Sequence, residues 1–348
     1  MQPPRRLIEG PYLRDLLAQP EAVAETCRAL GAADAGVIPA RFHGGDFDRM
    51  VLTGMGSSHH ALQAAVPELA GTGLPVVAVE AAELIHVQPG LLTDRTLLIV
   101  VSQSGESAEV HRLLDQIPAG CRVVGITNTP GSALARSAAL ALITAAGPET
   151  TVACKTYLAS VVTLLWFTAV LRGARPGPAA AELTAGAKAI AQYLSSWRDH
   201  VEQLAELLST VRQLYLTGRG TSLAAAGQGA LTLKEAARFP AEAMSCAAFR
   251  HGPLEILGPA TAVVVLEGPA NLAALNLRFL EDLRAQGGRV LHLGRNSTRA
   301  SLQLPPAPDR LLPLLEILPL QLTSVALATL VGREAGRFRL ATKITRAD

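Results

Sequence analysis

The chain has 348 residues, a length that favours two domains of ordinary size over one very large core. Hydrophobic residues make up 49% and charged residues only 17%, which excludes a disordered protein. A net charge of +2, with acids and bases mixed along the length, argues against a nucleic-acid or membrane partner. The cysteines lack C-x-x-C spacing, so neither disulfides nor a zinc site is predicted, and a cytoplasmic protein is expected.

The predicted elements of the first half alternate between strands and helices. Residues 1–40 are expected to form a helical lead-in whose charges do not fit a signal peptide. A first domain is predicted over 41–190, with Val-, Ile- and Leu-rich strands at 50–53, 75–79, 97–101 and 123–127. The apolar stretch 157–171 is shorter than the roughly 20 residues of a membrane span and predicts a buried helix.

The second half repeats the first. Residues 51–58 read V-L-T-G-M-G-S-S and residues 215–222 read Y-L-T-G-R-G-T-S, a spacing of 164 residues. Two later segments match in the same order at 165 and 167 residues, which indicates a duplicated unit. We therefore predict an α/β fold of two tandem domains, each a doubly wound, three-layer αβα arrangement with a parallel sheet between helices.

The boundaries of the second domain follow from proline and glycine. These residues cluster at 173–178, and the Ala-rich helical sequence that continues to about 208 is expected to link the domains. The second domain is predicted over 200–335, with a buried helix starting near Pro319, and a C-terminal tail over 336–348.

The turn at residues 102–107, S-Q-S-G-E-S, lies between a predicted strand and a predicted helix. Ligands bind at this end of a parallel sheet, where free backbone N–H groups and the helix dipole attract anions. Ser102, Ser104 and Ser107 add hydroxyl donors. Serines also cap ordinary helices, but three hydroxyls and a glycine at this edge favour a bound phosphate. The corresponding stretch of the second unit, 266–270, lacks hydroxyls, so phosphate binding is expected in the first domain only.

Other motifs suggest neither a cofactor nor a metal. The sequence G-M-G-S-S-H at 54–59 fits a dinucleotide motif poorly, although Ser57 and Ser58 could donate to the same phosphate. The scattered histidines lack H-x-x-x-H spacing, so no metal is expected.

Glu235 and His251 have the chemistry that aldose–ketose isomerisation needs, a proton-transferring carboxylate and a ring-opening group. A solvated Lys–Glu pair and a loop histidine are equally compatible with the sequence.

Several motifs together resemble the sugar isomerase (SIS) domain family. They are Y-L-R-D-L-L-A-Q-P at 12–20, G-S-S at 56–58, S-Q-S-G-E-S, N-T-P-G-S at 128–132, L-K-E at 233–235, A-E-A at 241–243 and R-H-G-P at 250–253. The similarity is greatest to the tandem-domain group that contains the isomerase half of glucosamine-6-phosphate synthase and amino-sugar-phosphate deaminases. It implies a sugar-phosphate aldose–ketose isomerase or deaminase without pyridoxal phosphate or another cofactor.

The resemblance also implies residue roles. Glu235 would move the proton between sugar carbons one and two, His251 would open the ring, and Lys343 would form a Schiff base with the sugar carbonyl. A homodimer is implied, with His251 entering the neighbouring subunit's site. The phosphate ligands implied are Ser57, Ser102, Gln103, Ser104 and Ser107.

The chain departs from the synthase pattern at several points. No glutamine-hydrolysing domain is expected in 348 residues, and Gln228 and Thr232 replace a glutamate and a lysine on the helix of the catalytic acid. Cys154 lies in a shortened V-A-x-T-K-like segment and is expected to be a packed residue, not a nucleophile. The alternatives are a fructosamine-type 6-phosphate deglycase, a neutral phosphosugar isomerase and a non-catalytic sugar-phosphate-binding regulator.

Overall fold

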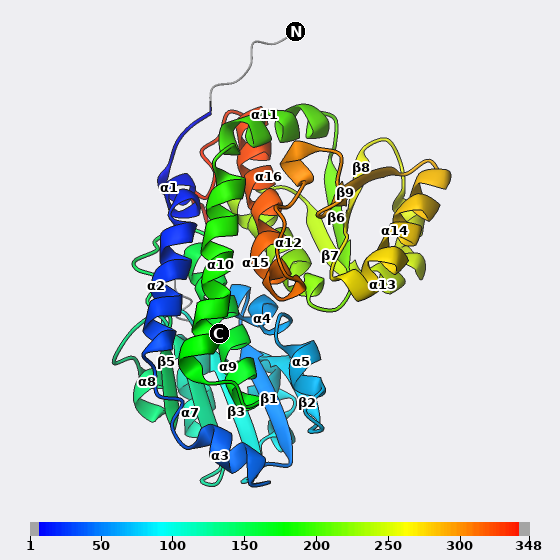
Figure 1. The fold of residues 1–348 in the computed structure, drawn as a ribbon. Coiled ribbons are helices and arrows are strands. Elements are labelled where there is room, and N and C mark those ends of the chain that lie inside the picture. The colour runs from blue at the N-terminus through cyan, green and yellow to red at the C-terminus, as the bar shows by residue number, and fades with distance from the viewer. Residues whose placement is uncertain (1–6, 341–348) are drawn as a thin grey trace. The chain divides into compact units, whose positions relative to one another are not determined.

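The computed structural model describes residues 7–340, which form two compact units, each built on one all-parallel sheet (Figure 1). The sheet-A unit comprises residues 21–148 and 155–185. The sheet-B unit comprises residues 7–20, 149–154 and 186–340. The predicted fold class, two parallel α/β domains flanked by helices, is confirmed.

Sheet A has the strand order β2-β1-β3-β4-β5. Its central strand β3 is buried along its whole length, which explains the unbroken apolar sequence T-L-L-I-V-V. The four strands predicted in the first half are confirmed within one or two residues. The strands are β1 (Arg49–Gly54), β2 (Val76–Glu80), β3 (Thr96–Val101), β4 (Arg122–Thr127) and β5 (Leu140–Ile143).

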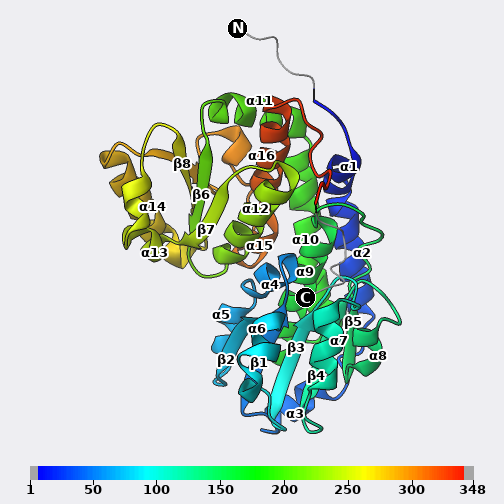
Figure 2. The same ribbon diagram turned by 180° about the vertical axis from the view of Figure 1, so that it is seen from behind.

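Helices cover both faces of sheet A. On one face lie α6, α7 and α8 (Figure 2). They pack through Leu84, Val110 and Leu134 against strand residues that include Val51 and Leu98. On the other face lie α4 and α9, and α9 is buried along nearly its whole length, as predicted. The helices of this part of the chain are α2 (Gln19–Gly31), α3 (Ile38–His43), α4 (Ser57–Leu62), α5 (Val66–Ala70), α6 (Ala81–His86), η1 (Pro89–Leu91), α7 (Ala108–Asp115), α8 (Ala133–Ser137), α9 (Lys155–Leu171) and α10 (Pro176–Leu194).

Sheet B repeats the topology of sheet A with one strand fewer. Its order, β7-β6-β8-β9, matches β2-β1-β3-β4. The three matched sequence segments fall on β1 and β6, on β3 and β8, and on β4 and β9, so the predicted duplication is confirmed. The strands are β6 (Gln213–Gly218), β7 (Ala241–Ser245), β8 (Thr261–Leu266) and β9 (Arg289–Leu293).

The two faces of sheet B carry different helices. Tyr215 of β6 packs edge-on against Phe249 of α13, with ring centroids 5.4 Å apart, and Phe279 of α14 joins the same cluster. The next residue, Leu216, points to the opposite face, where Gly229 lets α12 approach closely. The helices are α1 (Pro11–Leu17), α11 (Trp197–Leu208), α12 (Ser222–Ala236), α13 (Cys246–Arg250), η2 (Pro253–Ile256), α14 (Ala270–Ala285), η3 (Ala300–Leu302), η4 (Asp309–Leu311), α15 (Leu312–Leu315) and α16 (Ile317–Leu330).

The predicted apolar helix near the C-terminus begins slightly earlier than expected. The short helix α15 precedes α16, which starts at Ile317 and carries Pro319 in its first turn, where a missing N–H costs nothing. The stretch from Asp309 to Leu330 is long and apolar enough to cross a membrane, but its apolar window is completely buried. It has the burial of a core helix.

Candidate functional site

The serine-rich turn lies where β3 ends and α7 begins. Gly105 has φ +64°, a conformation that favours glycine, and a Cβ atom there would clash with Ser132. The turn is therefore possible in this form only with glycine at its centre. The three serine hydroxyls accept backbone hydrogen bonds. Ser102 accepts from Gly105 at 3.2 Å and Ser104 from Glu106 at 3.2 Å, both within the turn, and Ser107 caps α7 by accepting from Val110 at 3.4 Å.

A second loop, after β4, holds the turn in place. Glu106 accepts a hydrogen bond from the Ala133 N–H at 2.6 Å and lies 2.9 Å from the His111 ring nitrogen. The Ala133 hydrogen bond, with a smaller effect of His111, lowers the pKa of Glu106. The Thr127 hydroxyl donates to the Gln103 carbonyl at 3.2 Å. These bonds pre-organise the serine hydroxyls, each of which keeps its own O–H free to donate.

A pocket of about 140 Å³ opens beside the turn. Among the described residues that line it there is no lysine or arginine, so its donors are neutral hydroxyl and amide groups at a helix N-terminus. Ser57, at the start of α4, is not among the lining residues, whereas the other five predicted phosphate ligands are. The polar lining side chains are Ser58, Ser102, Gln103, Ser104, Ser107 and Glu109.

Glu109 is the pocket residue that sequence reasoning missed. It is 6% exposed, and its Oε2 has no hydrogen-bond partner in the described part of the chain. A carboxylate so placed can accept a hydrogen bond from a hydroxyl of a bound ligand. An acid in the first turn of a helix is ordinary, so the sequence contained no signal that separated Glu109 from a helix-stabilising residue.

The corresponding position in sheet B is occupied by the protein itself. Ser222 at the start of α12 matches Ser58, and its hydroxyl donates to Glu316 Oε1 at 3.0 Å. Burial, the largest effect, raises the pKa of Glu316 to about 8, against the hydrogen bonds from Ser222 and the Gly268 N–H. In the second domain, the serine hydroxyl at this position is thus bonded to an internal carboxyl group, whereas Ser58 of the first domain lines a pocket. This is a physical reason to expect no phosphate in the second domain.

Glu235, the predicted catalytic acid, is half-buried on α12. Its charge acts on the buried phenol of Tyr12, whose pKa is raised first by burial and further by Cys154, Glu235 and Glu149. The phenol also pairs with the Ser324 hydroxyl at 3.3 Å. Tyr12 therefore remains protonated beside Glu235. No chemical role was predicted for Tyr12, because a tyrosine in a helical lead-in carries no functional signal by itself.

The two departures from the synthase pattern lie on the same helix. Gln228 and Thr232 are both fully buried. The Gln228 amide donates to the Thr232 hydroxyl at 3.2 Å and to the Ala153 carbonyl at 3.3 Å. Neutral, mutually bonded side chains thus stand beside Glu235. Close by, Cys154 is buried and its thiol donates to Glu149 at 3.4 Å, as a packed residue would.

His251 and Glu235 are close in sequence but lie on opposite sides of sheet B. Glu235 belongs to α12, which packs on the Leu216 side of β6, whereas His251 ends α13, which packs on the Tyr215 side. His251 is exposed, and its ring contacts no hydrogen-bonding or charged partner among residues 7–340. The third predicted catalytic residue, Lys343, lies outside the described residues.

Candidate metal ligands do not gather in the described part of the chain. Residues 7–340 contain no group of three or more histidine, cysteine, aspartate or glutamate side chains arranged to hold a metal ion. None of the four cysteines, all of which lie within residues 7–340, forms a disulfide, and all four are buried.

Comparison with known proteins identifies relatives whose sequences match most of the chain. Glutamine–fructose-6-phosphate aminotransferase (isomerizing) of Pyrococcus horikoshii is 33% identical over 311 residues, which cover 86% of this chain and 52% of the relative. The chain thus spans about half the length of such relatives.

Solved structures share the fold along almost the entire chain. The C-terminal domain of glucosamine-fructose-6-phosphate aminotransferase from Francisella tularensis superposes with a TM-score of 0.82 at 24% identity, covering 95% of this chain and 98% of that one. Glucosamine-6-phosphate deaminase from Thermotoga maritima superposes with a TM-score of 0.77 at 19% identity, covering 97% and 100%.

The family assignment rests on two matches within one chain. The SIS domain pattern matches residues 46–170, which contain sheet A, and again residues 207–331, which contain sheet B. The chain therefore belongs to the SIS domain family and carries two SIS domains in tandem.

Proposed function

We propose that this chain is an isomerase or deaminase of amino-sugar 6-phosphates that binds the phosphate at the serine-rich turn. The observation that carries the proposal is the pocket at the end of β3, where Ser58, Ser102, Ser104, Ser107 and Gln103 meet. Relatives in sequence and fold are named for fructose 6-phosphate and glucosamine 6-phosphate, which supports a hexose 6-phosphate as the substrate class.

The proposed chemistry needs three groups and no cofactor. His251 opens the sugar ring, and Glu235 then takes the proton from one sugar carbon and returns it to the neighbouring one. Lys343 condenses with the sugar carbonyl, forming a C=N bond and releasing water. Tyr12, protonated beside Glu235, is a further hydrogen-bond donor in that part of the sheet-B unit. When the substrate carries an amino group, the proton transfer turns its C–N bond into a C=N bond, and a water molecule hydrolyses that bond to the ketose carbonyl and ammonia.

A homodimer with shared sites is part of the proposal. Glu235 and His251 lie on opposite sides of sheet B, which supports a site that takes these residues from different subunits. Mixing inactive Glu235→Gln and His251→Asn variants and allowing subunits to exchange should then restore about a quarter of wild-type activity, because half the dimers regain one intact site. No recovery in mixtures shown to contain heterodimers would contradict shared sites.

The main test is turnover on a panel of substrates. Ketose-phosphate and ammonia formation would be measured with aldose, amino-sugar and glycated amino-acid 6-phosphates, which also separates a deaminase from a deglycase and from a neutral isomerase. Glu235→Gln should reduce kcat by about 10²- to 10⁴-fold, the usual contribution of a proton-transferring group. Glu202→Gln, which removes an exposed acid of the same unit, is the matched control. Tight binding of panel members without turnover of any of them would refute the proposal that the chain is an isomerase or deaminase.

The second candidate is a non-catalytic sugar-phosphate-binding regulator. The neutral Gln228–Thr232 pair favours it, since these residues replace charged side chains beside the proposed catalytic acid. A regulator would bind sugar phosphates through the serine turn, show no turnover and be insensitive to Glu235→Gln. Loss of binding in a Ser102→Ala/Ser104→Ala double variant is expected from both candidates, so turnover decides between them.

A further inference from the structure

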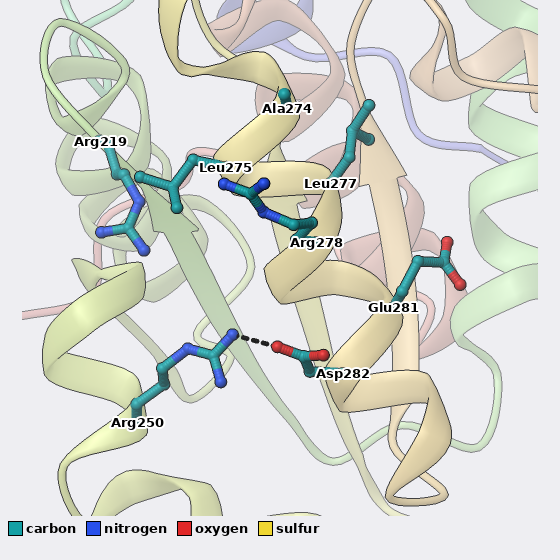
Figure 3. Close-up of a pocket in the computed structure, with 8 residues that line it drawn as sticks. All are labelled: Arg219, Arg250, Ala274, Leu275, Leu277, Arg278, Glu281 and Asp282. Atoms are coloured by element: carbon teal, nitrogen blue, oxygen red, sulfur yellow. Dashed lines mark hydrogen bonds and ion pairs between the residues drawn. The ribbon is translucent and has the colours of Figure 1, made fainter.

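A second pocket, of about 400 Å³, lies in the sheet-B unit and is bordered by three arginines (Figure 3). Arg219 comes from the turn after β6, Arg250 ends α13 and Arg278 is on the exposed side of α14. The turn of Arg219 corresponds to the G-M-G turn of the first domain, where Met55 stands in its place. Its cationic lining distinguishes this pocket from the neutral one beside sheet A.

Two of the three arginines have no countercharge among residues 7–340. Arg250 forms an ion pair with Asp282, and Glu281 pairs with Arg284 at 2.9 Å. By contrast, no carboxylate of the described residues pairs with Arg219 or Arg278. Figure 3 shows their guanidinium groups on either side of Leu275. The pocket lining also contains the acids Glu281 and Asp282, but both are already paired, so Arg219 and Arg278 are left to bind an anion such as a phosphate group.

The Arg219 side chain is also short of an acceptor. Its Nε is buried and has no hydrogen-bond partner in the described part of the chain. A buried donor without an acceptor is costly, and an oxygen of a bound anion would remove that cost. Arg250 is held in position by Asp282 and by the Phe279 ring, whose centroid lies 4.9 Å from its guanidinium carbon.

The pocket has an apolar wall beside its charges. Leu275 of α14 is 41% exposed, and Ala274 and Leu277 lie next to it. An exposed leucine between two guanidinium groups suits a ligand that combines an anionic group with an apolar body. Arginine matches phosphoryl oxygens with paired N–H donors, whereas a carboxylate carries half the charge.

We propose that this pocket binds the phosphoryl group of a small organic phosphate, with the organic part against Leu275. The phosphoryl oxygens accept hydrogen bonds from Arg219 and Arg278. This site is independent of the serine turn and of the proposed catalytic activity, because it uses different residues in the other unit.

The test is calorimetric titration of the full chain with phenyl phosphate and inorganic phosphate. Phenyl phosphate should bind more tightly, because only its ring can contact Leu275, and phenol should not bind. Arg278→Ala should weaken phenyl phosphate binding by roughly tenfold to a hundredfold, the effect of one lost charge-assisted hydrogen bond. Arg278→Lys should bind with intermediate affinity. Raising the ionic strength from about 0.01 to about 0.15 M should weaken binding, since it shortens the Debye length from about 30 to about 8 Å.

Two control variants distinguish binding in this pocket from nonspecific attraction to surface charge and from binding at the serine turn. Arg212→Ala removes an exposed charge just before β6, at the other end of the strand from Arg219, and should leave binding unchanged. The Ser102→Ala/Ser104→Ala variant should lose binding at the serine turn and keep the arginine-dependent binding. Arg278→Ala that binds like the wild type, or loss of all phenyl phosphate binding in the double serine variant, would overturn the proposal. Absence of saturable binding to the wild type would do the same.

Discussion

Replacing the buried Glu316 by glutamine should make the protein less sensitive to rising pH. Glu316 is completely buried between α15 and α16, and its Oε2 has no partner among the described residues. Burial raises its pKa to about 8 in the folded protein, against 4.5 for the unfolded chain. Because the folded-state pKa is raised, the unfolded chain loses the proton first, and stability falls as pH rises between these two values.

The size of the effect follows from the two pKa values. Each pH unit between them lowers the free energy of unfolding by about 1.4 kcal/mol. At pH 7.5 the protein is therefore less stable by about 4 kcal/mol than at pH 4.5 as far as this carboxyl group is concerned. Below pH 4.5 both states are protonated, and above about pH 8 both are ionised, so the dependence ends at those limits. Glutamine keeps the acceptor for Ser222 and has no proton to lose. The difference in the free energy of unfolding, Glu316→Gln minus wild type, should therefore increase as pH rises from 5 to 7.5.

The assay is urea unfolding at several pH values, followed by tryptophan fluorescence. The chain has two tryptophans, Trp166 in the sheet-A unit and Trp197 in the sheet-B unit. A Trp166→Phe background leaves Trp197 as the reporter of the unit that contains Glu316. Glu202→Gln, an exposed acid of that unit, is the control and should follow the parent at every pH. Parallel pH profiles for Glu316→Gln and the parent would refute a raised pKa at Glu316.

Three further substitutions test the packing and the turn. Gly105→Ala should destabilise the protein by about 1–3 kcal/mol, because a φ of +64° disfavours alanine and Ser132 leaves no room for its Cβ. Fructose 6-phosphate binding should also weaken. An unchanged melting temperature and an unchanged affinity would contradict this prediction. Tyr193→Phe should lower the free energy of unfolding in urea by about 1–3 kcal/mol, since the Tyr193 hydroxyl donates to the buried Ser301 carbonyl at 2.7 Å. A urea midpoint equal to that of the wild type would argue against this hydrogen bond. Phe279→Ala should lower the free energy of unfolding by about 3–5 kcal/mol in the same measurement, because the ring is fully buried between α14 and sheet B. A loss below about 1 kcal/mol would show instead that the core collapses into the space left by the ring.

Sequence patterns located the elements of the fold because these patterns are local. Apolar runs such as 97–101 mark strands buried on both faces, and the repeated L-T-G-x-G marks the same strand-to-helix turn twice. The serine turn could be placed at a strand end for the same reason, since its hydroxyls and glycine are adjacent in sequence. These signals require no knowledge of distant contacts.

Relations between distant segments were not visible in sequence. Glu235 and His251 are 16 positions apart, yet a strand between them and the alternation of Tyr215 and Leu216 put them on opposite sides of sheet B. Similarly, no pattern linked Ser222 with Glu316, which lies 94 positions away. Such pairings depend on which faces of helices and strands meet.

The sequence by itself thus determined the two tandem parallel sheets and the location of the serine turn, because strand and turn formation depend on neighbouring residues. Only the tertiary structure decided that Ser58, and not Ser57, lines the pocket, that Glu316 fills the corresponding place in the second domain, and that three separated arginines surround one cavity. Those features depend on side-chain direction and long-range packing, which a linear pattern does not encode.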